Sequence, residues 1–230
     1  MDQAGIQGVK GCVFDAYGTL FDFNSAAARC RGQLGPNADL LSKIWRDKQL
    51  QYTWLRSLMG RHADFWQITG DALDYAMKSL GLDDGAMRKK LMNLYRTLDV
   101  FPEVVATLER LKSGGLKTAI LSNGTPEMLE AAVKATGIAP LLDGIVSIET
   151  AGIYKPHPSV YGVALDSLSL EKNGVCFISS NAWDAHGASA FGMKTVWCNR
   201  YGQARENLPG SPDVEVATLA ELARVLGLEG

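Results

Sequence analysis

Asp15 directly follows the apolar pair Val13-Phe14 and precedes a glycine-containing segment that begins with Ala16 and Tyr17. Open parallel sheets expose their chemistry at the carboxyl ends of strands, so a carboxylate there is suited to act as a covalent nucleophile. The position two residues on carries an aromatic side chain instead of a second carboxylate. Asp15 therefore has poor means of protonating a leaving group.

Three later segments also place polar side chains where predicted strands end. Ser122 and Asn123 follow an apolar run and precede a predicted helix, whose free backbone N–H groups favour an anion. Capping that helix is their alternative role. Lys155 lies in a proline-stiffened loop, where its ammonium would keep a nearby carboxylate ionised, although a loop lysine is ordinarily solvated. Asp184 closes a polar cluster that begins at Ser179, and it also suits the first turn of a helix.

The elements that must position these side chains alternate between strands and helices. Helix 126–136 begins with proline and glutamate and ends before Gly137, and helix 103–111 follows Pro102 in the same way. Short apolar runs between the helices predict strands at 9–14, 117–121, 144–148, 175–179 and 195–197. This alternation indicates an α/β protein with a mainly parallel, Rossmann-like sheet covered on both faces.

One connection is far longer than the sheet requires. About 100 residues separate the first two predicted strands, whereas a crossover needs about a dozen. Apolar residues within this insertion follow helical three-and-four spacing. We therefore expect a core domain formed by 1–21 and 99–230, and a helical cap domain at 22–98 that closes over Asp15. Helices packed flush against the core, without a lid role, are the alternative.

Composition excludes several classes of function. The chain has 230 residues, 47% of them hydrophobic and 21% charged, with a formal net charge of −2. These values suit a soluble globular protein and do not favour nucleic-acid binding. No apolar run reaches the roughly 20 residues of a membrane helix, and 1–10 lacks the pattern of a secretory signal, so we expect a cytoplasmic protein.

The cysteines and histidines do not indicate a metal site. The four cysteines form no CxxC pair, and three of them lie in or beside apolar strand-like runs, so we interpret all four as structural. None of the three histidines is spaced from another ligand in a zinc-binding pattern. These residues are Cys12, Cys30, Cys176 and Cys198, and His62, His157 and His186.

Taken together, the four strand-end signals resemble the haloacid dehalogenase superfamily over nearly the whole chain. Most members are phosphatases with an Asp-x-Asp-x-Thr motif, in which the second aspartate protonates the departing alkoxide and Mg²⁺ offsets phosphoryl charge. Here the motif reads Asp15-Ala16-Tyr17-Gly18-Thr19. Halide leaves as a stable anion and needs no proton, so this asymmetry favours carbon–halogen cleavage. Segments 45–57 and 179–184 look like those of the (S)-2-haloacid dehalogenases in this superfamily.

The resemblance implies a two-step hydrolysis of a short (S)-2-haloalkanoic acid without a metal or other cofactor. Asp15 attacks the alpha carbon opposite the halogen, producing an aspartyl ester and free halide with inversion. Water then attacks the carboxyl carbon of the ester, which releases the (R)-2-hydroxy acid. We expect Asp184, supported by Asn181, to orient and deprotonate that water.

The resemblance also implies roles for the remaining site residues. Lys155, Thr19 and Ser179 would hold Asp15. Ser122 and backbone N–H groups near Ala16, Tyr17 and Asn123 would bind the substrate carboxylate. Arg46, assisted by Asn123, would receive the halide, although an exposed helix arginine is ordinarily only solvated. The expected wall of the pocket and its neighbours are Tyr17, Leu50, Phe65, Tyr161, Ser180 and Trp183.

Two other functions stay open at this point: a Mg²⁺-dependent phosphatase of the same fold, and a binding protein with a retired active site. The expected partners are the haloacid substrate and the halide ion. Because similar proteins pair through their cap helices, we also expect a homodimer.

Overall fold

The computed structural model describes residues 5–228, so the first four residues of the segment in which we expect no secretory signal lie outside it. Its centre is a six-stranded sheet of order β5-β4-β1-β6-β7-β8, in which all neighbouring strands are parallel. The strands are β1 (Gly11–Phe14), β4 (Lys117–Ser122), β5 (Gly144–Ser147), β6 (Val175–Ser179), β7 (Lys194–Cys198) and β8 (Val214–Val216).

The register of the central strands places the polar strand ends at one edge of the sheet. Phe14 at the end of β1 pairs with Ile120 of β4 and with Ile178 of β6. The residues that follow in each strand therefore emerge side by side. Every residue of β1 and β6 is buried, because helices cover both faces, and this explains their uninterrupted apolar sequences.

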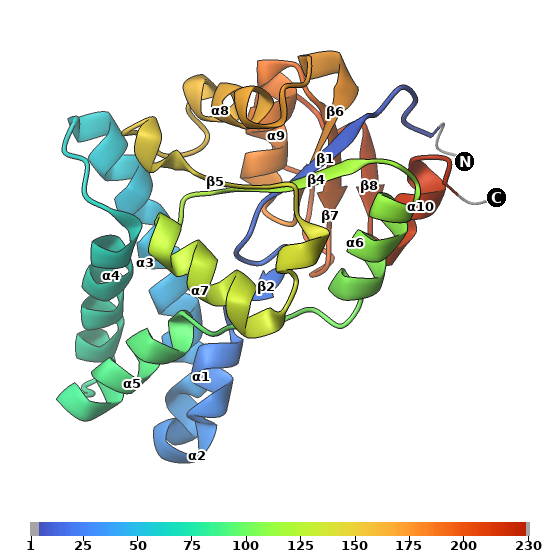
Figure 1. Cartoon of the computed structure of the whole chain (residues 1–230). Helices are drawn as coiled ribbons and strands as arrows, with labels where there is room; N and C mark the ends of the chain where they lie inside the picture. Colours follow the sequence, from blue (N-terminus) through green and yellow to red (C-terminus); the bar gives the residue numbers. More distant parts are fainter. Residues whose placement is uncertain (1–4, 229–230) are drawn as a thin grey trace.

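Helices cover the two faces of the sheet in the manner of a doubly wound fold (Figure 1). α8 packs on β4 and β5, α9 packs on β6 and β7, α6 packs on β4, and α7 packs on β5. These helices and the C-terminal one are α6 (Val104–Ser113), α7 (Pro126–Thr136), α8 (Pro158–Leu168), α9 (Ala182–Phe191) and α10 (Leu222–Val225). Single 3₁₀ turns are η1 (Gly35–Asn37), η2 (Ala139–Leu141), η3 (Ile148–Thr150), η4 (Lys172–Gly174) and η5 (Leu219–Glu221).

The long insertion between β1 and β4 is helical, as its apolar spacing predicts. Its helices gather to one side of the sheet in Figure 1, with α3 and α4 packed against each other. The two ends of the insertion pair as a short antiparallel ribbon, β2 (Phe21–Asp22) with β3 (Asp99–Val100). The inserted helices are α1 (Ser25–Arg29), α2 (Arg31–Leu34), α3 (Ala38–Met59), α4 (Phe65–Ser79) and α5 (Gly85–Tyr95). The division into core and cap domains stays a prediction.

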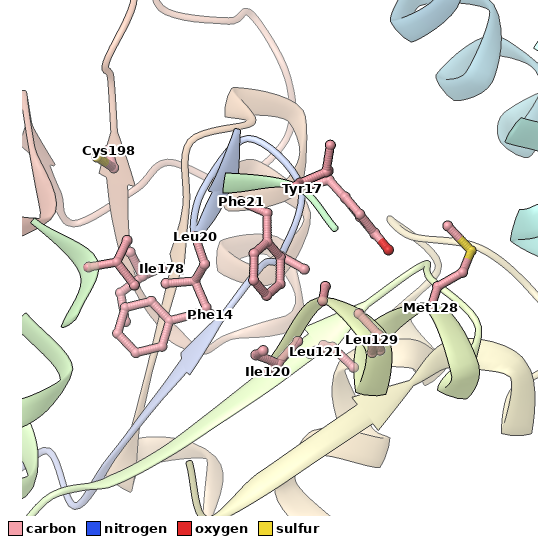
Figure 2. Packing of buried hydrophobic residues seen from close by; sticks show 14 of the residues in the cluster. Phe14, Tyr17, Leu20, Phe21, Ile120, Leu121, Met128, Leu129, Ile178 and Cys198 are labelled. Atoms are coloured by element: carbon pink, nitrogen blue, oxygen red, sulfur yellow. The ribbon is translucent and has the colours of Figure 1, made fainter. Parts of the chain in front are cut away.

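The main core lies between the sheet and its covering helices. Figure 2 shows Phe14, Leu20 and Ile178 packed together, while the Tyr17 ring points away from them. All four cysteines are buried and free, and burial raises the pKa of Cys12 to about 12, so that thiol stays protonated. Within residues 5–228, none of the helices is long and apolar enough to cross a membrane.

The predicted strands and helices are confirmed, with differences of a few residues at their ends. Helix 126–136 has the predicted bounds, because Thr125 caps its start and Gly137 ends it with a φ of +73°. The short strands β2, β3 and β8 were not expected. Each has two or three residues, too few to display an alternating pattern.

Candidate active site

Asp15 lies one residue beyond β1, where its backbone N–H still donates to the carbonyl of Ile178 at 2.9 Å. The chain then folds back tightly, and Thr19 Oγ1 donates to Asp15 Oδ2 at 3.2 Å. Gly18 makes this turn possible, because its φ is +91° and a Cβ there would lie 3.2 Å from the Phe23 ring. The Asp15 side chain is 9% exposed.

Lys155 is buried between two carboxylates. Its Nζ lies 3.1 Å from Asp15 Oδ1 and 2.8 Å from Asp184 Oδ2, and its side chain is 1% exposed. Burial alone would lower the pKa of this ammonium, but Asp15 and Asp184 outweigh burial and raise it. The alternative interpretation of Lys155, a solvated charge on a loop, is therefore wrong. Lys155 stays a cation that orients both carboxylates.

Asp184 is fully buried in the first turn of α9. Its Oδ1 accepts a hydrogen bond from the Tyr161 hydroxyl at 2.9 Å, and its Oδ2 accepts the one from Lys155. Burial raises the pKa of Asp184 to about 6, with Asp15 adding to the rise and Lys155 opposing it. A carboxylate with this pKa is a better proton acceptor near neutral pH than an exposed aspartate.

Asn181 joins Asp15 to the inserted helices. Its Nδ2 donates to Asp15 Oδ2 at 2.7 Å and to the carbonyl of Tyr17 at 3.1 Å, while its Oδ1 accepts from Arg46 Nη2 at 3.2 Å. The Arg46 guanidinium also lies 4.9 Å from the centre of the Phe23 ring. The Asn181 side chain therefore bridges the candidate nucleophile, Asp15, and a cation on α3, Arg46.

Ser122 and Asn123 lie at the end of β4, beside the Asp15 loop. Thr125 caps α7 by accepting from the amide of Met128, so the helix-capping alternative for Ser122 and Asn123 is wrong. Ser122 Oγ instead accepts from the amide of Gly124 at 3.1 Å, and Asn123 Oδ1 accepts from the amide of Lys155 at 3.2 Å.

Three backbone amides near this position are available to a ligand. Within the described part of the chain, the amides of Ala16, Tyr17 and Asn123 donate to no backbone carbonyl. Free amides just beyond the ends of two neighbouring strands, with the Ser122 hydroxyl beside them, suit a carboxylate group.

Aromatic side chains of the Asp15 loop and of the inserted helices pack against one another beside the site. The Tyr17 ring lies 5.6 Å from that of Phe65 and stacks on that of Tyr95 at 5.4 Å. Trp183 meets Trp54 edge to face at 5.3 Å. A cavity of about 460 Å³ opens beside them, and its lining includes Arg46, Leu50, Ser180, Asn181 and Trp183.

Some expected contacts differ from those in the structure. Ser179 Oγ accepts from the amide of Asn181 and does not reach Asp15, whose second oxygen is held by Asn181 itself. Asn181 therefore does not support Asp184, a role that falls to Tyr161. Asn123 accepts from the Lys155 amide, and Arg46 donates instead to Asn181, to the carbonyl of Tyr17 and to Gln49, of which only Gln49 was not singled out in the sequence.

Other expected residues support the site from nearby. Ser180 contributes its amide, which donates to Thr19 Oγ1 at 2.8 Å. Tyr161 is fully buried, and its hydroxyl donates to Asp184. Among residues 5–228, no group of three or more His, Cys, Asp or Glu side chains could hold a metal ion.

Comparisons with known proteins agree with this geometry. The sequence model for haloacid dehalogenase-like hydrolases matches residues 9–192. The chain belongs to the haloacid dehalogenase-like hydrolases. Within this family it is similar to (S)-2-haloacid dehalogenase 1 of Pseudomonas sp. (strain CBS-3), with 45% identity over 219 residues, covering 95% of this chain and 96% of that protein.

Two solved structures that are similar to this chain contain a bound reaction species. One is a dehalogenase with an intermediate complex, 44% identical, with a TM-score of 0.93, covering 96% of this chain and 98% of that one. The other is L-2-haloacid dehalogenase from Xanthobacter autotrophicus with chloropropionic acid covalently bound, 34% identical, with a TM-score of 0.90, covering 96% of this chain and 100% of that one.

Proposed function

We propose that this chain hydrolyses short (S)-2-haloalkanoic acids to (R)-2-hydroxyalkanoic acids and halide. The observation that carries the proposal is the Asp15 carboxylate, anchored by Lys155, Thr19 and Asn181 while the neighbouring acid position holds Tyr17. Such a group can attack carbon but cannot protonate a leaving group, so the leaving group must be stable as an anion. The similarity to (S)-2-haloacid dehalogenases over nearly the full length supports this substrate class.

In the first step an oxygen of Asp15 attacks the alpha carbon from the side opposite the halogen. Among residues 5–228, Oδ2 accepts two hydrogen bonds, from Thr19 and Asn181, whereas Oδ1 accepts one, from Lys155. Oδ1 is therefore the freer nucleophile. The carbon–halogen bonding pair leaves with the halide, the new carbon–oxygen bond forms an ester of Asp15, and the alpha carbon is inverted.

In the second step water attacks the carboxyl carbon of the Asp15 ester. Asp184 accepts the water proton, a role supported by its raised pKa and by the two donors that fix its orientation, Lys155 and Tyr161. Cleavage of the ester then regenerates Asp15, and the proton held by Asp184 passes to the departing alkoxide oxygen, which releases the hydroxy acid. Because attack occurs at the carboxyl carbon, the inverted alpha carbon is not altered again.

The substrate carboxylate is held by the Ser122 hydroxyl and by the free amides of Ala16, Tyr17 and Asn123. Arg46 receives the departing halide at the cavity wall. The halogen and alkyl group lie against Tyr17, Leu50, Phe65 and Trp183, where exclusion of water strengthens the charge interactions. We further propose that 22–98 acts as a cap domain, because Arg46 and the aromatic wall from α4 approach Asp15 from this insertion.

The decisive experiment follows the oxygen atoms through one turnover. The protein is mixed with substoichiometric (S)-2-chloropropionate in H₂¹⁸O, and both product and protein are analysed by mass spectrometry. We expect unlabelled (R)-lactate and one ¹⁸O in the peptide that contains Asp15. Label that appears directly in lactate would contradict the ester mechanism, and Asp15→Asn should release no chloride.

The runner-up function, a Mg²⁺-dependent phosphatase, is separated by a second assay. The Lys155 ammonium already bridges the two carboxylates of the site, Asp15 and Asp184, so we propose that the reaction needs no divalent cation. Chloride release from each enantiomer of 2-chloropropionate should be unchanged by a chelator and confined to the (S) form. Hydrolysis of a generic phosphate ester that is lost on chelation would favour the phosphatase.

A further inference from the structure

Gln49 on α3 is a buried amide that contacts the Arg46 guanidinium. Its side chain is fully buried, and its Oε1 accepts hydrogen bonds from Arg46 Nη1 at 2.8 Å and from the Tyr95 hydroxyl at 3.1 Å. Its Nε2 donates to Thr69 Oγ1 at 2.8 Å, and Thr69 in turn donates to the carbonyl of Phe65. Both ends of the amide are satisfied, so its orientation is determined.

Three inserted helices meet at this amide. Gln49 and Arg46 lie on α3, Thr69 on α4 and Tyr95 at the end of α5. Burying a polar side chain costs free energy, and here hydrogen bonds at both ends of the amide offset that cost. Its oxygen accepts from the Arg46 guanidinium, and Gln49 itself does not line the cavity that Arg46 lines.

Arg46 is partly buried and has no carboxylate partner among residues 5–228. Its hydrogen-bond acceptors within residues 5–228 are the neutral oxygens of Gln49, Tyr17 and Asn181, and no carboxylate lies within ion-pair distance. Arg29 and Arg88, in contrast, pair with aspartates. An arginine held only by neutral oxygens keeps its full charge for an incoming anion.

We propose that Gln49 is a positioning residue that aims the Arg46 guanidinium at the departing halide and leaves its charge unneutralised. This inference rests on the proposed dehalogenation, and it explains why residue 49 is an amide and not a carboxylate. A glutamate would have nearly the same shape, but its carboxylate would form an ion pair with Arg46 and compete with the halide. The guanidinium would keep its position, but its charge would be neutralised and would attract the halide less.

The test compares Gln49→Glu with Gln51→Glu, the same chemical change two residues along α3 at an exposed position whose side chain contacts Lys48. The probes are the rate of bromide release in a single turnover of (S)-2-bromopropionate, the rate of the later ester hydrolysis, and the dissociation constant of sodium bromide measured by titration calorimetry. We expect Gln49→Glu to slow bromide release about 100-fold, the size of loss seen when one donor to a developing anion is removed. Bromide binding should weaken about tenfold or more.

Ester hydrolysis should keep its wild-type rate in Gln49→Glu, because that step involves no halide, and Gln51→Glu should match the wild type throughout. Slowing of both steps by the same factor would indicate a merely structural role and overturn the proposal. So would wild-type rates of bromide release. If Gln49→Glu fails to fold, Gln49→Met decides: it removes the acceptor for Arg46 without adding charge, and undiminished bromide release and binding would overturn the proposal.

Failure of the proposed function is recognised separately. If the wild-type protein releases halide from neither enantiomer, dehalogenation is wrong. The bromide titration then still tests whether Gln49 controls an anion site at Arg46, because it requires no turnover.

Discussion

At the scale of residues, the site divides its work between two carboxylates whose surroundings differ. Asp15 sits near the cavity with donors on both oxygens, and Asp184 is fully buried against Lys155 and Tyr161. Lys155 touches both, so one ammonium orients the nucleophile and the candidate base together. This sharing predicts that the two chemical steps can be separated by changing one side chain.

Asp184→Asn should leave the first step intact and block the second, because the amide keeps the shape of the side chain but cannot accept a proton from water. We expect one equivalent of halide per chain, followed by almost no turnover. Mass spectrometry should find the acyl group attached to Asp15. Asp166→Asn, at an exposed position of α8, is the matched control and should turn over normally. Normal turnover by Asp184→Asn would exclude it as the base.

The pH dependence follows from the raised pKa of Asp184, about 6. As pH falls through this value the base becomes protonated, so hydroxy acid formation should slow between about pH 8 and about pH 5 while the initial release of halide persists. Rapid-mixing assays that follow halide and lactate separately would measure this. If halide release and lactate formation slow by the same factor as pH falls, Asp184 is not the titrating group.

The effect of pH on folding stability through Asp184 is opposite to its effect on the rate of hydroxy acid formation. Folding raises the pKa of Asp184 above its ordinary 3.8, so the folded state binds the proton more tightly than the unfolded state. Its contribution to folding is therefore present below about pH 4 and is lost as pH rises through about 6.

At the scale of elements, the end of each strand and the start of the next helix form the binding surfaces. α7 begins at Pro126, a few residues after Ser122, and its first turn is held by the Thr125 cap. Local signals therefore position the loop that we propose binds the substrate carboxylate.

Thr125→Ala should lower the free energy of unfolding by about 1 kcal/mol, because the amide of Met128 loses its acceptor. Urea denaturation followed by circular dichroism would measure the change. Thr136→Ala, in the last turn of the same helix, is the control and should cost less. An unchanged midpoint for Thr125→Ala would show that solvent replaces the cap without loss.

At the scale of the whole molecule, side chains of the insertion contact the part of the chain that forms the sheet at several places, and one of them is the candidate site. The Arg46–Asn181 hydrogen bond lies on one side, and on another Tyr154 donates to the carbonyl of Ala63 at 2.5 Å. His62 and Glu149 join the same loops at 3.1 Å. The cytoplasmic location stays a prediction, as does the homodimer, for which the exposed apolar side chains of α3 provide a candidate surface.

We expect sedimentation velocity to give twice the mass of one chain. Leu58 on α3 is 85% exposed, so Leu58→Arg should shift the protein toward the monomer if the dimer forms through the inserted helices. Val105→Arg, on α6 of the sheet domain, is the control and should not. A monomeric wild-type protein would contradict the expected dimer.

Three features can be recognised in the amino-acid sequence alone: the alternation of strands and helices, the long insertion, and the candidate nucleophile Asp15 with an aromatic residue two positions later. These are local properties: apolar period, capping residues and short motifs can be recognised within a few neighbouring residues. Helix α7 is the clearest case, since Thr125, Pro126 and Gly137 mark both of its ends.

Which side chains support one another cannot be recognised before the chain is folded. Lys155 and Asp15 are 140 residues apart, and the burial that makes their contact strong exists only after the sheet assembles. Gln49 reads in the sequence as one more polar residue on a helix, because its partners Thr69 and Tyr95 come from two other helices. Long-range burial and hydrogen bonding leave no periodic signal in the chain, and the charge and aim of Arg46 depend on them.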